Sequence, residues 1–267
     1  MKSLAWYYPR DLEEATLLLQ EPGVVPHGGG TGLLRTGLGH VSGLLDLRYL
    51  PVHHFSAQDG LIEIGAGLTF AEVVRRMSAL DPDSVLVKSL SRAAATPLRN
   101  RITVGGSVAM APPWSDLLGP LVALEAEVVL AGGREETCSV ADYVEDRERR
   151  AGTLVTAVRV KREPWQSVYS RATATYFDYA AFTITVLAKT NDGLVEDIRL
   201  AVVGAKNKVS RLRELEASLI GQPVGAPQVP ALGADLGLEF PAKTIGGPKY
   251  VAHLFRVELE RALAALG

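Results

Sequence analysis

The run over residues 99–118 constrains this chain more than any other stretch of its sequence. Residues 102–104 favour a short strand, and the pair Gly105-Gly106 that follows can adopt positive φ and bring the backbone close to a ligand. Backbone amides in such a bend can converge on an anion without a basic side chain, and Ser107 adds a hydroxyl donor. Short glycine motifs are weak indicators, so an ordinary turn before a capped helix is the alternative interpretation.

The residues after this bend, Ser115 and Asp116, indicate that the bound anion is part of a nucleotide. Ser115 or Asp116 is the predicted N-cap of an apolar helix over residues 117–124, and this position directs Asp116 back toward whatever the glycines bind. A carboxylate beside a phosphate needs hydroxyl groups from which to accept hydrogen bonds, and a ribose provides them. We therefore interpret the run as a nucleotide site, with the pyrophosphate on Gly105-Gly106 and the sugar near Asp116.

A second glycine-rich segment follows a predicted strand at residues 24–26. It consists of Gly28, Gly29, Gly30, Thr31, Gly32 and Leu33. Consecutive glycines cost conformational entropy, so they are typical of places where the backbone lies against something else. A flexible surface turn is the alternative, but two such bends after two short strands favour two backbone nests on one pyrophosphate. The segment lacks the Gly-x-Gly-x-x-Gly spacing of doubly wound nucleotide folds, which disfavours that architecture.

Size and composition indicate an ordinary globular chain. The 267 residues suffice for two domains, and a formal net charge of −2 gives no support for nucleic acid or an anionic membrane as a partner. The sequence shows no signal-peptide core and no apolar run long enough to span a membrane, so we expect a cytoplasmic protein. Cys138 is the single cysteine and the five histidines are scattered. This excludes a disulfide framework or an iron–sulfur cluster built by this chain alone, and it disfavours a metal site.

Local signals predict where several helices begin. Asp11 is the predicted cap of the first helix, and Thr69 with Glu72 forms a capping box for another. Ser210 is the predicted cap of a helix over residues 211–220, and Pro248 opens the last helix. The positions expected to face the core from that last helix are Tyr250, Leu254, Leu259, Leu263 and Leu266.

Turn and charge signals predict the connections between elements. Asp59-Gly60 and residues 191–193 are typical of the tight turns in β-hairpins. The charge run over residues 145–150 predicts a solvated loop. Residues 221–237 are rich in glycine and proline and predict another loop.

The central run closely resembles the signature of a known family. Its pattern, Arg-Asn-x-x-Thr-Val-Gly-Gly-Ser-x-Ala followed by x-Pro-x-x-Ser-Asp-Leu, is similar to that of the FAD-binding medium subunit of the molybdenum hydroxylases, the xanthine dehydrogenase and carbon monoxide dehydrogenase relatives. The resemblance covers nearly the whole chain. It implies an α+β fold with a two-lobed FAD-binding domain of the PCMH (vanillyl-alcohol-oxidase-like) type over residues 1–166, whose lobes lie at about 1–52 and 53–166. A small C-terminal α+β domain with an antiparallel sheet and helices is implied over residues 167–267.

The resemblance also assigns cofactor-binding roles. The family's Ala-Gly-Gly-Thr loop matches Gly29-Gly30-Thr31, whereas Gly32 replaces a usual Asp or Ser and Ile102 replaces a usual Gly or Ala. Arg171 stands where the family has a lysine and is the expected cation near the N1/C2 end of the flavin. Tyr179 is expected against one face of the flavin ring. The complete set of residues predicted to bind FAD is Gly28, Gly29, Gly30, Thr31, Gly32, Leu33, Thr103, Gly105, Gly106, Ser107, Asp116, Leu154, Arg171, Asp178 and Tyr179.

The function that the resemblance implies is that of an FAD-carrying subunit of a molybdopterin-dependent hydroxylase or dehydrogenase. Such a subunit accepts electrons from a [2Fe–2S] small subunit and passes them to an acceptor such as NAD or a quinone, while a large subunit holds the molybdopterin. A hetero-oligomer with these partner subunits is therefore expected. Two alternatives stay open: a stand-alone flavin reductase resembling UDP-N-acetylenolpyruvylglucosamine reductase, and a flavin-free scaffold homologue.

Overall fold

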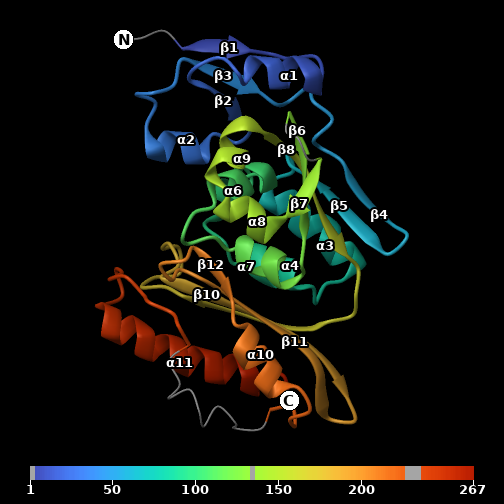
Figure 1. Cartoon of the computed structure of the whole chain (residues 1–267), viewed down its shortest axis with the longest axis vertical. Helices are drawn as coiled ribbons and strands as arrows, with labels where there is room; N and C mark the ends of the chain where they lie inside the picture. Colours follow the sequence, from blue (N-terminus) through green and yellow to red (C-terminus); the bar gives the residue numbers. More distant parts are fainter. Residues whose placement is uncertain (1–3, 133–135, 226–235) are drawn as a thin grey trace. The chain divides into compact units, whose positions relative to one another are not determined.

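A computed structural model describes residues 4–132, 136–225 and 236–267 of the chain, which falls into two compact units (Figure 1). Unit 1 comprises Met1–Arg76, Ala95–Ala111 and Glu125–Arg162. Unit 2 comprises Met77–Ala94, Pro112–Leu124 and Glu163–Gly267. The two units interleave along the sequence, and a contiguous domain boundary near residue 166 stays a prediction.

The first part of unit 1 is a three-stranded parallel sheet with the order β1-β3-β2. Its elements are β1 (Ala5–Tyr7), α1 (Leu12–Leu18), β2 (Val24–His27), α2 (Thr31–Thr36) and β3 (Gly43–Asp46). α1 begins as predicted, because the Asp11 side chain accepts a hydrogen bond from the Glu14 amide at 2.8 Å. β2 leads directly into the glycine-rich segment, so the end of a sheet strand fixes where that segment starts.

The larger sheet of unit 1 has five antiparallel strands in the order β4-β5-β8-β6-β7. These strands are β4 (Phe55–Gln58), β5 (Leu61–Gly65), β6 (Glu127–Ala131), β7 (Thr137–Ser139) and β8 (Leu154–Lys161). Besides α1 and α2, the helices of this unit are α5 (Thr96–Arg99), α6 (Val104–Met110), α8 (Val140–Glu145) and α9 (Arg147–Gly152), and α3 (Phe70–Leu80) begins there. The predicted turn is confirmed, since Asp59 and Gly60 adopt φ of 51° and 75° between β4 and β5. The predicted capping box is confirmed by the Thr69 amide, which donates to Glu72 Oε2 at 2.8 Å.

The solvated loop predicted over residues 145–150 is wrong. α8 and α9 occupy this region, and each has a side-chain cap: Ser139 accepts a hydrogen bond from the Asp142 amide, and Asp146 accepts one from the Arg149 amide. The loop was predicted only from the run of charged residues over positions 145–150. Two capping residues in succession satisfy the first amides of two short helices, and this decides the local structure.

The pair of Glu63 and Arg159 across β5 and β8 makes the stability of the protein depend on pH. Arg159 Nε donates to Glu63 Oε2 at 2.6 Å, and this hydrogen bond holds the pKa of Glu63 below its ordinary value of 4.5. Because the folded pKa lies below the unfolded one, ionised Glu63 stabilises the fold above about pH 4.5, and this contribution disappears as the pH falls through the lowered pKa.

We therefore expect Glu63→Gln to lower the free energy of unfolding at pH 7 by less than about 1 kcal/mol, because the pair is partly exposed. At pH 3 we expect almost no difference from the wild type. Urea unfolding curves at both pH values measure this. An equal loss of stability at pH 3 and pH 7 would show that the ion pair is not its cause.

Unit 2 is built on an antiparallel sheet of four strands with the order β12-β11-β10-β9. Its strands are β9 (Gln166–Ala172), β10 (Phe182–Asn191), β11 (Leu194–Val203) and β12 (Val209–Arg211). Its helices are α4 (Val85–Leu90), α7 (Leu118–Ala123), α10 (Arg213–Leu219) and α11 (Pro248–Ala264). The turn predicted at residues 191–193 is confirmed, with Asp192 and Gly193 at φ of 50° and 76° between β10 and β11.

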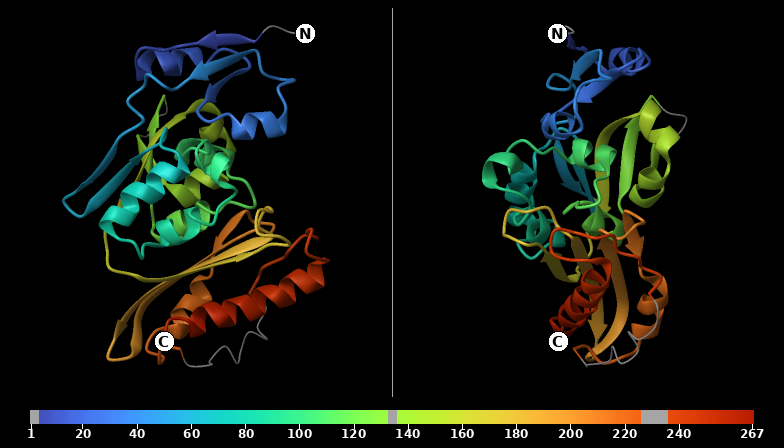
Figure 2. Two further views of the ribbon diagram at one scale, coloured as in Figure 1. Left: turned by 180° about the vertical axis from the view of Figure 1, so that it is seen from behind. Right: turned by 90° about the vertical axis from the view of Figure 1, so that its left-hand side faces the viewer.

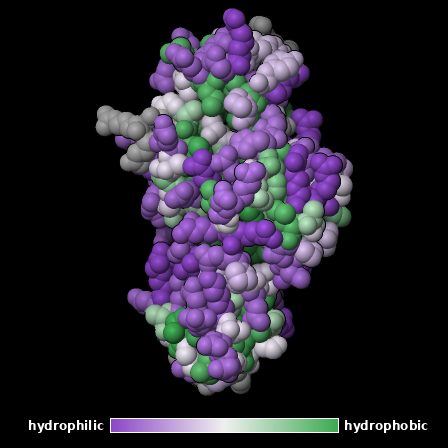
Figure 3. Space-filling model, turned by 90° about the vertical axis from the view of Figure 1, so that its right-hand side faces the viewer, coloured by the Kyte–Doolittle hydropathy of each residue, from purple (hydrophilic) through white to green (hydrophobic). Residues whose placement is uncertain are grey.

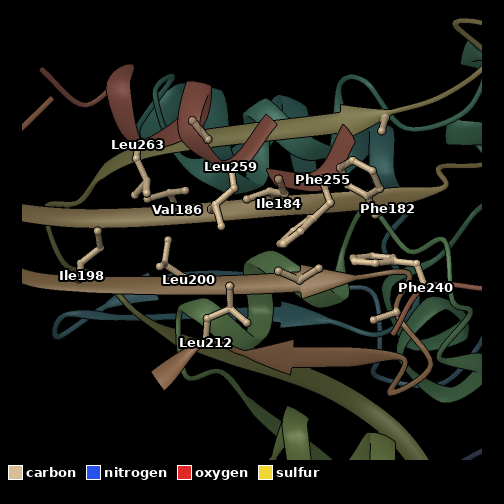
Figure 4. Packing of buried hydrophobic residues seen from close by; sticks show 14 of the residues in the cluster. Phe182, Ile184, Val186, Ile198, Leu200, Leu212, Phe240, Phe255, Leu259 and Leu263 are labelled. Carbon is tan, nitrogen blue, oxygen red and sulfur yellow. The ribbon is translucent and has the colours of Figure 1, made fainter. Parts of the chain in front are cut away.

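Helices pack on both faces of this sheet. The side chains of β10 alternate between the two faces, so that some meet α11 and the others meet α7. Phe182 and Ile184 point toward α11 in the hydrophobic cluster that Figure 4 shows. The intervening Thr183 and Thr185 face α7, where a Cβ on Gly119 would lie 2.9 Å from Thr185 Oγ1. Both views in Figure 2 show α11 running along the sheet. The sheet of unit 2 is therefore a buried layer.

The last helix begins at Pro248 as predicted, and its predicted core face is confirmed at Leu254, Leu259, Leu263 and Leu266 but is wrong at Tyr250. Tyr250 is 53% exposed. The buried residues of α11 are Val251, Phe255, Leu259, Ala262 and Leu263. The predicted leucines lie on the same face as Val251 and Phe255, whereas Tyr250 lies beside that face at the start of the helix.

The helix predicted over residues 211–220 begins later than expected, and its predicted cap is wrong. β12 pairs with β11, so Ser210 lies in a strand and α10 starts at Arg213. Pairing with β11 satisfies the backbone around Ser210 in a way that a local capping pattern does not reveal. Of the loop predicted over residues 221–237, residues 226–235 lie outside the described residues.

The described part of the chain contains neither a candidate membrane span nor a candidate metal site. None of its helices is long and apolar enough to cross a membrane. No three of its His, Cys, Asp and Glu side chains are grouped as ligands of a metal ion, and Cys138 is a half-buried free thiol in β7. The face drawn in Figure 3 carries mainly hydrophilic residues, with smaller hydrophobic areas between them.

Candidate cofactor site

The glycine-rich segment after β2 adopts a conformation that requires glycine. Gly30 lies at φ 74°, in the left-handed region, immediately before α2. At Gly29 a Cβ atom would lie 1.5 Å from the carbonyl oxygen of Arg101, so no side chain fits there. These two positions explain why the segment keeps its glycines, and they argue against a flexible surface turn.

Arg101 ties this segment to the central run. Its Nε and Nη2 donate to the Gly29 carbonyl oxygen at 3.2 and 2.9 Å, while its own carbonyl oxygen packs on Gly29. Gly28 faces Thr103, whose Oγ1 would lie 3.0 Å from a Cβ on that glycine. The two glycine-containing runs predicted to share one ligand therefore lie side by side within unit 1.

The bend predicted at Gly105-Gly106 is wrong, because these residues form the first turn of α6. Neither has positive φ, and the Thr103 side chain caps the helix by accepting a hydrogen bond from the Gly106 amide at 3.2 Å. The Gly105 amide donates to the carbonyl oxygen of Ala66 at 2.8 Å. Both amides thus have partners inside the chain. Gly105 is needed for packing instead, since a Cβ there would lie 2.6 Å from the Cβ of Ala66.

The amides left open lie in the first glycine-rich segment. Within the described residues, the amides of Gly29, Gly30, Thr31 and Gly32 donate to no backbone or side-chain acceptor, as is general for amides at the start of a helix. Gly32 also lacks the polar side chain expected at its position, and a Cβ there would lie 1.9 Å from Sδ of Met110. The described residues provide no acceptor for these amides, which can therefore bind water or an anion.

In unit 2, the residues at the end of the central run have separate roles. Ser115 Oγ accepts hydrogen bonds from the amides of Leu117 and Leu118 at 3.2 and 3.1 Å, and this fixes the turn that leads into α7. Asp116 is buried, and its Oδ1 accepts hydrogen bonds from the Tyr169 hydroxyl at 2.6 Å and from Arg171 Nε at 2.8 Å. Neither predicted residue is the N-cap of α7, because Leu117 occupies that position and the helix has no side-chain cap.

Burial dominates the electrostatics around Asp116. Desolvation raises the pKa of Asp116 above its ordinary value, and the charge of Arg171 and the hydrogen bond from Tyr169 oppose that shift. Burial also raises the pKa of Tyr169 well above its ordinary value, so its hydroxyl keeps its proton and donates a hydrogen bond to Asp116. The result is a buried ion pair with a fixed orientation.

Arg171 links Asp116 to the loop between β9 and β10. Its Nη1 and Nη2 donate to the carbonyl oxygens of Tyr176 and Asp178 at 3.3 and 2.5 Å. Tyr179, in the same loop, is 57% exposed. The structure therefore gathers four of the predicted residues, Asp116, Arg171, Asp178 and Tyr179, in one cluster of unit 2.

The other predicted residues lie in unit 1, and four of them are buried: Thr103, Gly105, Ser107 and Leu154. Sequence reasoning missed Arg101 and Tyr169. The signal for Tyr169 was its position two residues before Arg171, because residues at that spacing share one face of a strand. Arg101 gave no comparable signal, since its partner Gly29 is 72 residues away in the sequence.

Comparison with known proteins places both halves of the chain in one family. Residues 2–162 match the family model of the FAD binding domain in molybdopterin dehydrogenase, and residues 167–266 match that of the CO dehydrogenase flavoprotein C-terminal domain. The 6-hydroxypseudooxynicotine dehydrogenase complex subunit alpha of Paenarthrobacter nicotinovorans is 27% identical over 245 residues, which cover 87% of this chain and 82% of that protein. The glyceraldehyde dehydrogenase medium chain of Sulfolobus acidocaldarius is 29% identical over 130 residues, so the match spans 47% of this chain and only 46% of that relative.

Solved structures share the fold. A chain of reconstituted CO dehydrogenase from Oligotropha carboxidovorans matches with a TM-score of 0.88 at 22% identity, over 99% of both chains. A chain of quinoline 2-oxidoreductase from Pseudomonas putida 86 matches with a TM-score of 0.88 at 21% identity, over 99% of this chain and 96% of that one. The predicted α+β fold is thereby confirmed. By its family models and its relatives, this chain belongs to the FAD-binding medium subunits of the molybdenum hydroxylases, a family of oxidoreductases.

Proposed function

We propose that this chain is the FAD-carrying subunit of a molybdopterin-dependent hydroxylase or dehydrogenase. Bound FAD would supply the redox chemistry, taking up electrons from a [2Fe–2S] subunit and releasing them to an external acceptor such as NAD or a quinone. The observation that carries the proposal is the set of open amides at residues 29–32, in a domain of an FAD-binding family. The chain's own task is to bind and orient the cofactor.

The first glycine-rich segment fits the pyrophosphate of FAD. The amides of residues 29–32 need acceptors, and closely spaced amides at the start of a helix favour phosphate oxygens. The absence of side chains at Gly29 and Gly30 keeps that surface accessible. We therefore assign the pyrophosphate to residues 28–33. α6, whose first amides have partners inside the chain, supports this segment through Arg101 and Thr103.

The remaining predicted contacts stay proposals with separate supports. Tyr179 offers an exposed aromatic ring on which a flat ring system can stack, and Arg171 and Asp178 lie beside it. Asp116 offers Oδ2 to a ribose hydroxyl, because both of its internal hydrogen bonds are made by Oδ1. Leu154 supplies an apolar contact at the start of β8.

The composition of the chain and the names of its relatives support partner subunits. An iron–sulfur cluster is usually held by four cysteines, whereas this sequence has one, Cys138. Its relatives are named as a medium chain and as a subunit of a dehydrogenase complex. We propose a molybdopterin-binding large subunit and a [2Fe–2S] small subunit as partners, in a cytoplasmic hetero-oligomer.

Cofactor titrations test the proposed function. We expect the purified chain to bind one FAD, with the visible absorption of a bound flavin, and to bind FMN much more weakly, because FMN lacks the pyrophosphate that residues 28–33 would hold. A folded chain that binds neither compound supports the flavin-free scaffold. A chain that binds FAD, copurifies with no partner and reduces a small-molecule substrate by itself supports the stand-alone reductase.

A further inference from the structure

The guanidinium of Arg171 is hydrogen-bonded through all three of its nitrogens. Nε donates to Asp116 Oδ1 at 2.8 Å, Nη1 to the carbonyl oxygen of Tyr176 at 3.3 Å, and Nη2 to that of Asp178 at 2.5 Å. The Arg171 side chain is 6% exposed and that of Asp116 is 9% exposed. The planar group therefore spans a carboxylate on one side and two main-chain carbonyls on the other.

The loop that accepts two of these hydrogen bonds carries exposed aromatic side chains. Tyr176, Phe177 and Tyr179 are 62%, 65% and 57% exposed, and the ring centroids of Trp114 and Tyr179 lie 4.9 Å apart. Residues 175–179, here named the aromatic loop, contain neither helix nor strand. Because these rings are so exposed, their burial contributes little to the order of the loop, and hydrogen bonds to its main chain matter more.

The carboxylate that orients Arg171 is itself fixed from two directions. Asp116 follows Ser115, whose side chain accepts hydrogen bonds from the amides of Leu117 and Leu118, and it accepts the 2.6 Å hydrogen bond from the Tyr169 hydroxyl. Tyr169 and Arg171 lie two residues apart on one face of β9. Asp116, Tyr169 and Arg171, here named the Arg171 network, thus join the segment before α7, β9 and the aromatic loop within unit 2.

We propose that the Arg171 network is a positioning device that holds the aromatic loop and orients the Tyr179 ring. Arg171 is a positioning residue in this arrangement, because it acts through the carbonyl oxygens of the loop and not through its charge on a ligand. The inference deepens the proposed function, and rests on it, where Tyr179 is assigned to the flavin. The holding of the loop itself does not depend on FAD.

The variant Arg171→Lys distinguishes a role in holding the aromatic loop from a role that depends on positive charge alone. It keeps a positive charge beside Asp116 but offers one nitrogen, which cannot serve a carboxylate and two carbonyl oxygens in the geometry of the planar guanidinium. A role based on charge alone therefore predicts that Arg171→Lys behaves like the wild type. The positioning role predicts that the aromatic loop is released.

Limited proteolysis with chymotrypsin measures that release, because the protease cleaves after tyrosine and phenylalanine. In FAD-free protein we expect Arg171→Lys to be cleaved in the aromatic loop about tenfold faster than the wild type, with the sites mapped by mass spectrometry. Arg213→Lys, the same exchange at an exposed position of α10, is the control and is expected to match the wild type. Equal cleavage of Arg171→Lys and the wild type would overturn the proposal.

Two further measurements distinguish positioning from a general structural role. If Arg171→Lys accelerates cleavage after the core residue Phe255 as much as in the aromatic loop, the network stabilises the whole unit and the proposal is wrong. In a background with Trp6→Phe and Trp165→Phe, Trp114 is the remaining tryptophan. We expect Arg171→Lys to increase its quenching by acrylamide, because release of the loop removes the contact with Tyr179.

FAD titrations keep this test distinct from that of the proposed function. Failure of the wild type to bind FAD contradicts the proposed function and leaves the proteolysis result valid. With FAD bound, we expect Arg171→Lys to shift the flavin absorption spectrum, since the Tyr179 ring is no longer held. An unchanged spectrum together with a released loop contradicts the assignment of Tyr179 to the flavin, while the positioning of the loop stands.

Discussion

Replacing Gly29 with alanine is expected to weaken FAD binding roughly 10- to 100-fold, because overpacking of a tight contact costs about 1–3 kcal/mol. The added Cβ would lie 1.5 Å from the carbonyl oxygen of Arg101, and a backbone atom cannot avoid it by a change of rotamer. The loop must therefore move away from residue 101, which also breaks the hydrogen bonds from the Arg101 guanidinium to Gly29. Titration of the FAD-free protein, followed by flavin fluorescence, measures the change.

The matched control for this variant is Gly39→Ala. Nothing lies within 4 Å of a Cβ at Gly39, so the same exchange there is expected to leave FAD affinity and the melting temperature unchanged. Gly28→Ala provides an intermediate case, because its Cβ would lie 3.0 Å from the movable Thr103 side chain. If Gly29→Ala bound FAD as tightly as Gly39→Ala, the assignment of the pyrophosphate to this segment would be wrong. If Gly29→Ala fails to fold, the comparison of Gly28→Ala with Gly39→Ala decides.

Features whose cause lies within a few residues could be predicted from the sequence. The cap at Asp11 and the capping box of Thr69 and Glu72 each depend on a side chain and an amide three positions apart. The turns at Asp59-Gly60 and at residues 191–193 depend on two residues that tolerate positive φ. Such signals hold in any tertiary context that does not oppose them.

Features decided by distant parts of the chain could not be predicted. Gly105-Gly106 was interpreted as an open bend because glycine permits one. In the structure the carbonyl oxygen of Ala66 accepts a hydrogen bond from the Gly105 amide, and the Ala66 side chain leaves no space for a Cβ at Gly105. Ser210 has the chemistry of a cap, yet β11 pairs with its strand. In each case a contact from another element overrides a valid local preference.

In the candidate site, too, the features with a local cause could be predicted and those that depend on distant residues could not. The glycine-rich segment at residues 28–33 could be found from composition alone, since the entropy cost of its glycines needs a compensating contact. The role of Arg171 could not, because its partner Asp116 is 55 residues earlier in the sequence. The positive charge of Arg171 predicts a contact with a ligand. In the folded chain its guanidinium donates hydrogen bonds to the Asp116 carboxylate and to two main-chain carbonyl oxygens.

Replacing Phe182 with alanine is expected to lower the free energy of unfolding of unit 2 by about 3–5 kcal/mol. Phe182 is fully buried at the start of β10, and its ring centroid lies 5.8 Å from that of Phe240 and 5.5 Å from that of Phe255 (Figure 4). The change removes buried apolar surface and leaves a cavity between the sheet and α11. Urea unfolding of the Trp6→Phe protein measures it, because both remaining tryptophans, Trp114 and Trp165, then report on unit 2.

Phe177→Ala is the matched control, since it removes the same ring from a side chain that is 65% exposed. We expect it to change the free energy of unfolding by no more than about 0.5 kcal/mol. The two phenylalanines are five positions apart, so a difference between them reports burial and not their position in the sequence. If the two variants lost equal stability, Phe182 would not belong to the core that joins α11 to the sheet. If Phe182→Ala alone is destabilised, burial of the Phe182 ring against Phe240 and Phe255 is what stabilises the start of β10.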